Sequence, residues 1–150
     1  MQQPARPLAL PAADAATRSQ VVAALARPRM ANDYSETVMT LVLSIRLMAA
    51  AMRSNMDPVV ELTRRLNSLT AAKSVLDLAR ACSQAWPENV AVNRPCCHAL
   101  SPDEAVFADM ASASLAADRD AFSAVLDGLV RRERHDGLYA AMTRAVASVA

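Results

Sequence analysis

The chain has 150 residues, a formal net charge of +1 at pH 7, and a composition that is 53% apolar and 21% charged. This length suits one domain with a single core, and the apolar fraction excludes a disordered chain. Alanine is abundant while only two residues are glycine, which favours closely packed helices over hairpins. The sequence therefore predicts an all-α, bundle-like fold of six to seven short helices in one compact domain.

Residues 1–12 are predicted to form a flexible, proline-rich leader ahead of a helical domain over residues 13–150. An export signal needs about 7–15 unbroken apolar residues, and prolines interrupt the apolar run here. Three cysteines, two of them adjacent, do not make the disulfide framework of a secreted domain. We therefore expect a cytoplasmic protein. Its first helix is expected over residues 13–27, where Pro28 ends it.

A second helix is expected to begin near Asp33 or Ser35, either of which can cap it, and to continue through residues 37–52. This stretch is almost entirely apolar, and a helix with no polar face lies either in a protein core or in lipid. A membrane span needs about 20 residues with few charges. Because the apolar run is shorter and contains Arg46, the sequence favours a core helix over a membrane span.

Two further helices are expected before the middle of the chain. Asp57 is a capping residue, and Pro58 follows it at the first helical position. Apolar residues then recur at helical spacing over residues 59–69, and a fourth helix is expected over residues 70–86. Residues 87–100 contain two prolines and show no period, so they are predicted to form one long internal loop.

Three short antiparallel helices are predicted after this loop. Residues 101–104 read Ser-Pro-Asp-Glu, which combines a capping box, a proline at the first helical position and acidic side chains in the first turn. Asp118 is expected to cap the next helix, which the apolar pattern extends over residues 119–132. The last helix carries its apolar face between Leu138 and Val149, and the short connections indicate neighbouring antiparallel helices.

Charge is distributed unevenly along the chain. Residues 1–95 carry a net charge of +4, and residues 96–150 carry a net charge of −3. Nearly all the basic residues are arginine, which favours bidentate pairing with carboxylates. The two halves could therefore pair with each other, although an excess of arginine also arises from genomic base composition and carries no functional weight here.

One cluster of chemically reactive side chains lies in the predicted loop, where Cys96, Cys97 and His98 are consecutive. A zinc site needs about four ligands, commonly from two close pairs, and the side chains of consecutive residues diverge. Cys82 is expected to face the core, and His135 lies among charged residues. The sequence predicts no metal and no cofactor, and the residues that could contribute to such a site are Cys96, Cys97, His98 and Cys82.

A reactive thiol is the other chemical interpretation of this loop. Arg94 and the nearby helix start would lower the pKa of a thiol. A disulfide between adjacent cysteines, however, closes a strained ring, and the carboxylates of Asp103 and Glu104 are already used at the helix start. The sequence favours two small apolar side chains packed under the loop, with His98 at the surface.

Other functional classes lack their characteristic patterns. The two glycines are isolated, so no phosphate-binding loop is present, and no serine lies in a nucleophile elbow. Nucleic-acid binding is disfavoured because the net charge is near zero and aromatic residues are scarce. The sequence therefore favours a protein that is not an enzyme.

The stretch "RPCCHALSPDEAVFADM", followed by "DRDAF" and an alanine-rich end, resembles a group of short, alanine-rich helical bacterial proteins of unknown function. The upstream stretch "LVLSIRLMAAAMR" is similar to the same group. The resemblance implies a small helical fold and no catalytic residues. It also implies that the cysteine-bearing loop recurs in that group.

Two functional hypotheses follow. The first is a non-enzymatic protein-interaction or regulatory module that binds a protein partner or a second copy of itself. Its basis is the apolar helix over residues 37–52. If that helix is partly exposed, Met39, Met48, Met52 and Met56 add adaptable contact surface; otherwise these methionines belong to the core. The alternative is a metal- or thiol-dependent protein that uses the loop with Cys96, Cys97 and His98.

Overall fold

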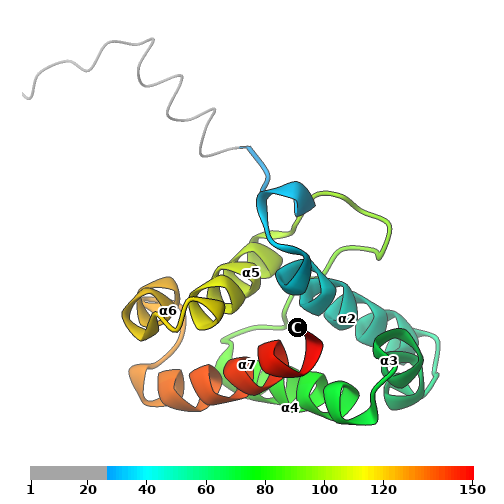
Figure 1. Cartoon of the computed structure of the whole chain (residues 1–150). Helices are drawn as coiled ribbons and strands as arrows, with labels where there is room; N and C mark the ends of the chain where they lie inside the picture. Colours follow the sequence, from blue (N-terminus) through cyan, green and yellow to red (C-terminus); the bar gives the residue numbers. More distant parts are fainter. Residues whose placement is uncertain (1–26) are drawn as a thin grey trace, which may run out of the picture.

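The computed structural model describes residues 27–150, and in this part of the chain it is built from helices without a strand (Figure 1). The all-α prediction is confirmed. Six α-helices and two 3₁₀ turns follow one another along the described chain: η1 (Ala31–Asp33), α2 (Glu36–Arg53), α3 (Pro58–Leu66), α4 (Leu69–Ala85), α5 (Pro102–Leu115), α6 (Arg119–Leu126), η2 (Arg132–Arg134) and α7 (His135–Val149). The leader expected over residues 1–12 and the helix expected over residues 13–27 lie outside the described residues, apart from Arg27.

Side-chain caps start most of these helices at the positions that the sequence predicted. The hydroxyl of Ser35 accepts a hydrogen bond from the Val38 amide at the start of α2, and the Asp57 carboxylate does the same for Val59 in α3. At α5 the capping box is complete, with Ser101 and Glu104 each bonded to the other's backbone amide. Such caps satisfy amides that have no partner within the helix.

The helix expected over residues 119–132 is shorter than predicted. Helix α6 ends at Leu126, and the chain then turns through Gly128 at a φ of +81°. Glycine adopts this left-handed conformation without steric cost. Val130 is buried all the same, because the turn returns it to the core. The apolar stripe was thus a correct indication of burial but the wrong indication of helix length.

The helices pack around one apolar core. Helices α4 and α7 lie side by side at the base of the view in Figure 1, while α2 and α5 cover them from above. Helix α6 lies at the edge, where the rings of Phe122 and Tyr139 meet edge to face at 5.0 Å. The largest fully buried apolar side chains come from every α-helix: Phe122, Leu41, Leu62, Leu78, Met110, Leu126, Leu138, Met142, Val38, Val42 and Val75.

Ion pairs join the two halves of the chain, which carry opposite net charges. Arg46 on α2 pairs with Glu104 on α5, with 2.7 Å between Nε and Oε1. Nearer the surface, Arg29 pairs with Asp109 at 3.2 Å, and the Tyr34 hydroxyl donates to the same carboxylate. The pKa of Tyr34 is raised to about 12. Burial is the larger cause of this pKa shift, and the hydrogen bond to Asp109 is the second.

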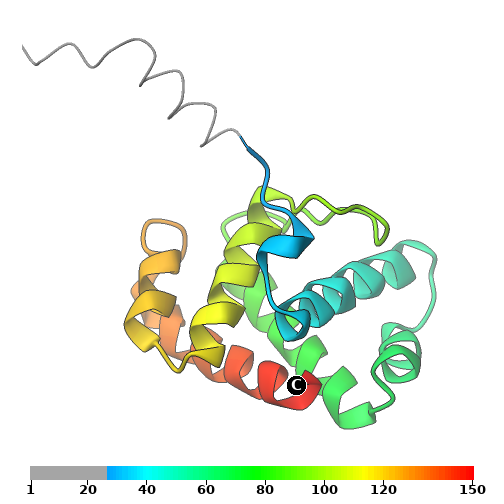
Figure 2. The same ribbon diagram turned by 45° about the horizontal axis from the view of Figure 1, so that its top comes forward.

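The described N-terminal segment lies against the loop that contains the cysteines. Met30 forms an isolated antiparallel bridge with Ala99, flanked by hydrogen bonds from Ala31 to His98 and from Leu100 to Arg29. Figure 2 shows this segment beside the loop, directly before α2 begins. The loop is therefore held on one side by the start of the described chain.

Candidate functional site

Arg46 holds the loop over residues 87–100 from inside the protein. Its side chain is 1% exposed and forms two parallel hydrogen bonds with Glu104, at 2.7 and 2.8 Å. The other guanidinium hydrogens point to backbone carbonyls of the loop, with Cys97 as the partner of Nη1 and Ala99 as the partner of Nη2 at 2.9 Å. A buried arginine is tolerable only when its donors are satisfied in this way.

Glu104 is bonded as fully as its partner. Its oxygens accept hydrogen bonds from the backbone amides of Asn93 and Ser101 in addition to the two from Arg46. Burial by itself would raise the pKa of Glu104, but these hydrogen bonds outweigh burial and hold the pKa below its ordinary value. The pair therefore stays charged and orders the loop, and no free donor or acceptor is left for chemistry.

The predicted candidate residues do not converge on one site. Cys96 is exposed, Cys97 is half-buried, and His98 is exposed on a wide hollow between the loop and the start of α2. Cys82 is buried on α4 and lines a different cavity. The expectation that both adjacent cysteines pack under the loop is wrong for Cys96, because the β-turn closed by the hydrogen bond from the Cys97 amide to Arg94 lifts it into solvent.

Metal ligands do not gather in the described part of the chain. Over residues 27–150, no group of three or more histidine, cysteine, aspartate or glutamate side chains is placed to share an ion. His135 is buried, and its Nε2 lies 3.1 Å from the Val130 carbonyl oxygen. Burial raises the pKa of the Cys82 thiol to about 12, so this thiol is uncharged and unreactive near neutral pH.

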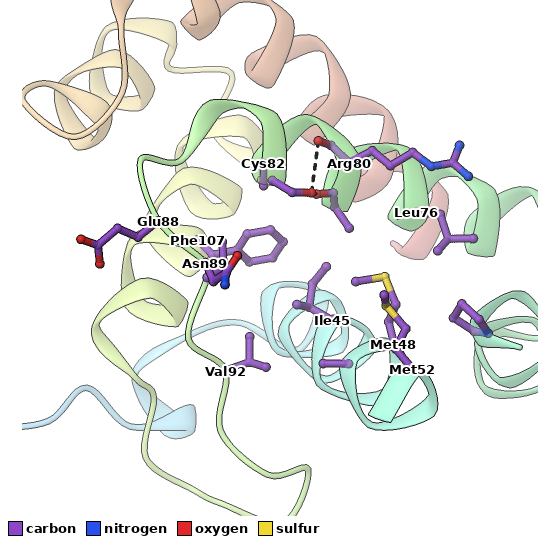
Figure 3. Close-up of a pocket in the computed structure, with 15 residues that line it drawn as sticks. Ile45, Met48, Met52, Leu76, Arg80, Cys82, Glu88, Asn89, Val92 and Phe107 are labelled. Atoms are coloured by element: carbon purple, nitrogen blue, oxygen red, sulfur yellow. Dashed lines mark hydrogen bonds between the residues drawn. The ribbon is translucent and has the colours of Figure 1, made fainter. Parts of the chain in front are cut away.

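An apolar groove lies between α2 and α4 (Figure 3). Its volume of about 400 Å³ lies within the range of about 300–1,000 Å³ that is usual for ligand sites. We call it the α2–α4 groove. It is lined by Ile45, Met48, Ala49, Met52, Pro58, Leu76, Ala79, Arg80, Cys82, Ser83, Glu88, Asn89, Val90, Val92 and Phe107.

Methionines give this groove an adjustable wall. Met48 and Met52 are one turn apart on α2, and their side chains lie next to each other at the groove in Figure 3. Met52 is 63% exposed, and Met56 beyond the end of α2 is 48% exposed. Flexible thioether side chains adapt to irregular partner surfaces. The sequence identified these methionines as possible contact surface, and the structure places two of them in the lining.

A second, more polar hollow adjoins the groove and shares Ser83, Glu88 and Asn89 with it. Trp86 lines this hollow and is 8% exposed. Its Nε1–H is buried and has no hydrogen-bond acceptor among the described residues. A buried donor without a partner costs about 1–3 kcal/mol. Sequence reasoning missed this feature, because burial of the indole nitrogen depends on how α4 meets the loop.

Comparisons with known proteins add no relative. No protein-family model matches the chain, and no curated protein or solved structure matches it at a significant level. The resemblance to alanine-rich helical bacterial proteins therefore stays a prediction.

None of the helices within residues 27–150 has both the length and the apolar character that crossing a lipid bilayer requires. Helix α2, which the sequence showed to be almost entirely apolar over residues 37–52, contacts α3, α4, α5 and α7. Its inner residues belong to the core, while the face with Met48 and Met52 borders the groove.

Proposed function

We propose that this protein is a non-enzymatic interaction module that binds an amphipathic helix of a partner protein in the α2–α4 groove. The observation that carries the proposal is the apolar groove between two helices, whose lining includes Met48 and the exposed side chain of Met52. Grooves between two helices accept a third helix through its apolar stripe. A lining of methionines is typical of surfaces that bind such helices.

The dimensions of the groove favour a short helical contact. On α2 the lining residues run from Ile45 to Met52, which at about 1.5 Å per residue is roughly 11 Å. This length matches two turns of a partner helix with apolar residues at positions i, i+3 or i+4, and i+7. Arg80 and Glu88 at the rim offer one charge of each sign to the polar flanks of the partner.

A photo-crosslinking experiment on the full chain tests this proposal. Met52 is replaced by the photoreactive residue p-benzoylphenylalanine, and Leu115, which is exposed but does not line the groove, is replaced in a matched control. We expect a crosslink from position 52 only, to a segment with an apolar stripe at helical spacing. A peptide of that segment should bind the wild-type chain. Its affinity for the Ala79→Phe variant, in which the phenylalanine fills the groove, should be at least tenfold lower.

A second substitution separates a filled groove from a general surface effect. Ala140 is exposed on α7 and does not line the groove, so Ala140→Phe should leave peptide affinity unchanged. Equal crosslinking from positions 52 and 115 would overturn the proposal. A crosslinked partner segment without an apolar stripe would also overturn it. A crosslink only to a second copy of this chain, with a dimer mass by light scattering, would replace the partner helix with self-association.

The metal- or thiol-dependent alternative has less support. Cys82 lines the α2–α4 groove, whereas Cys96, Cys97 and His98 border a different hollow, so the four residues would act separately. This arrangement does not supply the several ligands that a structural or catalytic metal takes. Elemental analysis of protein purified without added metal tests this alternative directly, and one equivalent of zinc or iron would revive it.

A further inference from the structure

We propose that the α2–α4 groove and the adjoining hollow together form a site for a small neutral acyl amide, a molecule with an apolar tail and an amide head. This inference goes beyond the partner helix proposed above, because it assigns a small-molecule ligand to the same groove. Ligand and partner would then exclude each other, which makes the ligand a regulator of partner binding. Three observations carry the inference: the volume of the groove, the position of Trp86 and the position of Glu88.

The apolar tail fits the part of the groove between the two helices. There the lining is formed by Ile45, Met48 and Leu76, and Phe107 lies beside Asn89 in the same view (Figure 3). The charge of Arg80, which also lines the groove, is directed past Leu76 in Figure 3, where the side chain is largely exposed and pairs with Asp77 at 3.6 Å. The volume of about 400 Å³ is that of a site for a small organic molecule.

The amide head fits the adjoining hollow, whose lining includes Trp86, with an unpaired donor, and Glu88, with a carboxylate acceptor. The buried Trp86 Nε1–H is a donor without an acceptor among the described residues, and an indole can only donate. The Glu88 carboxylate, which is exposed, forms no ion pair within residues 27–150 and can only accept when ionised. An amide supplies both complements, since its carbonyl accepts from Trp86 and its N–H donates to Glu88.

Binding requires a small movement of the chain at this end. The Trp86 nitrogen is buried, so the exposed residues 87–89 must shift for a ligand carbonyl to reach it. These residues lie outside any helix, between the end of α4 and the rest of the loop. The gain is that a donor left unpaired in the free protein becomes hydrogen-bonded in the complex.

Charge at this end selects among ligands with the same tail. A carboxylate head would meet the negative charge of Glu88, and its oxygens could not donate to it. A neutral amide avoids this repulsion. The structure therefore favours decanamide over decanoate, although both carry the same apolar tail, and the substitution Glu88→Gln should remove most of the difference.

The test uses the full chain, with the fluorescence of Trp86, the single tryptophan, as the reporter. Decanamide and decanoate are titrated below the concentrations at which they aggregate. We expect a saturable change in emission with decanamide and at least tenfold weaker binding of decanoate. In Glu88→Gln the two affinities should come within about threefold, with the decanamide affinity little changed. Ala79→Phe should abolish both titrations, and Ala140→Phe should leave them intact.

Calorimetry provides a readout that does not depend on the indole. In Trp86→Phe, checked for folding by circular dichroism, decanamide affinity should fall about tenfold while decanoate affinity changes less. The inference is overturned if decanamide gives no saturable signal, if decanoate binds as tightly to the wild-type chain, or if Trp86→Phe leaves decanamide affinity unchanged. Each of these outcomes leaves the crosslinking test of the partner helix unaffected, so failures of the two proposals can be told apart.

Discussion

Arg46 and Glu104 face each other across the core with two parallel hydrogen bonds, and the same two side chains hold the backbone of the cysteine-bearing loop. This pair joins α2 to the start of α5, over a separation of 58 residues. A buried pair of this kind contributes little net stability compared with apolar residues, but it is costly to break on one side only.

Replacing Glu104 by glutamine should therefore lower the free energy of unfolding by about 3–5 kcal/mol, because it leaves the Arg46 charge buried without its counterion. Urea unfolding followed by circular dichroism measures this change. Asp77→Asn is the matched control, since it breaks an exposed pair with Arg80 that is worth at most about 1 kcal/mol. Equal effects of the two substitutions would contradict the role assigned to the buried pair.

Removing both partners should separate stability from loop order. In the double variant Arg46→Met, Glu104→Leu, no buried charge is left, so much of the stability lost in Glu104→Gln should return. The carbonyls of Cys97 and Ala99 lose their donors at the same time. We expect faster hydrogen exchange at the amides of Cys97 and Leu100 than in the wild-type chain. Unchanged exchange there would mean that the N-terminal segment alone orders the loop.

Acid should weaken the fold through Glu104. Its pKa in the folded protein lies below its ordinary value of about 4.3, so the unfolded chain binds more protons between the two values. The contribution to stability is complete above pH 4.3 and is lost as the pH falls toward the folded pKa. Unfolding midpoints measured from pH 6 to pH 3 should drop more steeply for the wild-type chain than for Glu104→Gln, which has no proton to bind at this position.

The three thiols should react in the order of their exposure. The Cys82 thiol has a pKa of about 12, so near pH 8 only about one part in 10⁴ of it is ionised. Cys82 is in addition only 5% exposed, which limits access of the reagent. We expect iodoacetamide to modify Cys96 at least 100-fold faster than Cys82, with Cys97 between them, as measured by mass spectrometry of timed samples. In urea all three should react alike. Comparable rates in the folded chain would show that the α2–α4 groove opens readily.

The two glycines offer a paired test of backbone conformation. An added Cβ meets no atom within 4 Å at Gly128 or at Gly137, so packing does not confound the comparison. Gly128→Ala should destabilise the chain by about 1 kcal/mol, because its φ of +81° is unfavourable for alanine. Gly137→Ala lies in the first turn of α7 and should stabilise by about 0.5–1 kcal/mol. Thermal unfolding of both variants measures the difference, and two changes of the same sign would contradict the assigned conformations.

Local signals in the sequence predicted most of the helix starts because capping is a short-range effect. Ser35, Asp57 and Ser101 each bond to an amide within three residues, so their neighbours in the sequence suffice to identify them. The end of α6 could not be found in this way. Leu129 and Val130 continue the apolar pattern, but their burial comes from a turn whose geometry depends on α7.

The candidate site was harder to predict because its parts come from distant segments. The sequence drew attention to Cys96, Cys97 and His98 as neighbours along the chain, whereas the α2–α4 groove joins Met48, Leu76 and residues of the loop. The sequence also did not identify Glu104 as the buried partner of Arg46. The sequence supplied an excess of arginine in one half and of carboxylates in the other, but which charges meet inside depends on how α2 crosses α5.

The bridge between Met30 and Ala99 has a practical consequence for anyone who handles this protein. A segment fused ahead of residue 30 would be connected, through two backbone hydrogen bonds, to the loop that contains Cys96 and Cys97. Tension or bulk applied on that side of residue 30 is therefore transmitted to the loop before it reaches α2. A purification tag or an immobilisation handle attached on the C-terminal side of α7 places no load on the loop with Cys96 and Cys97.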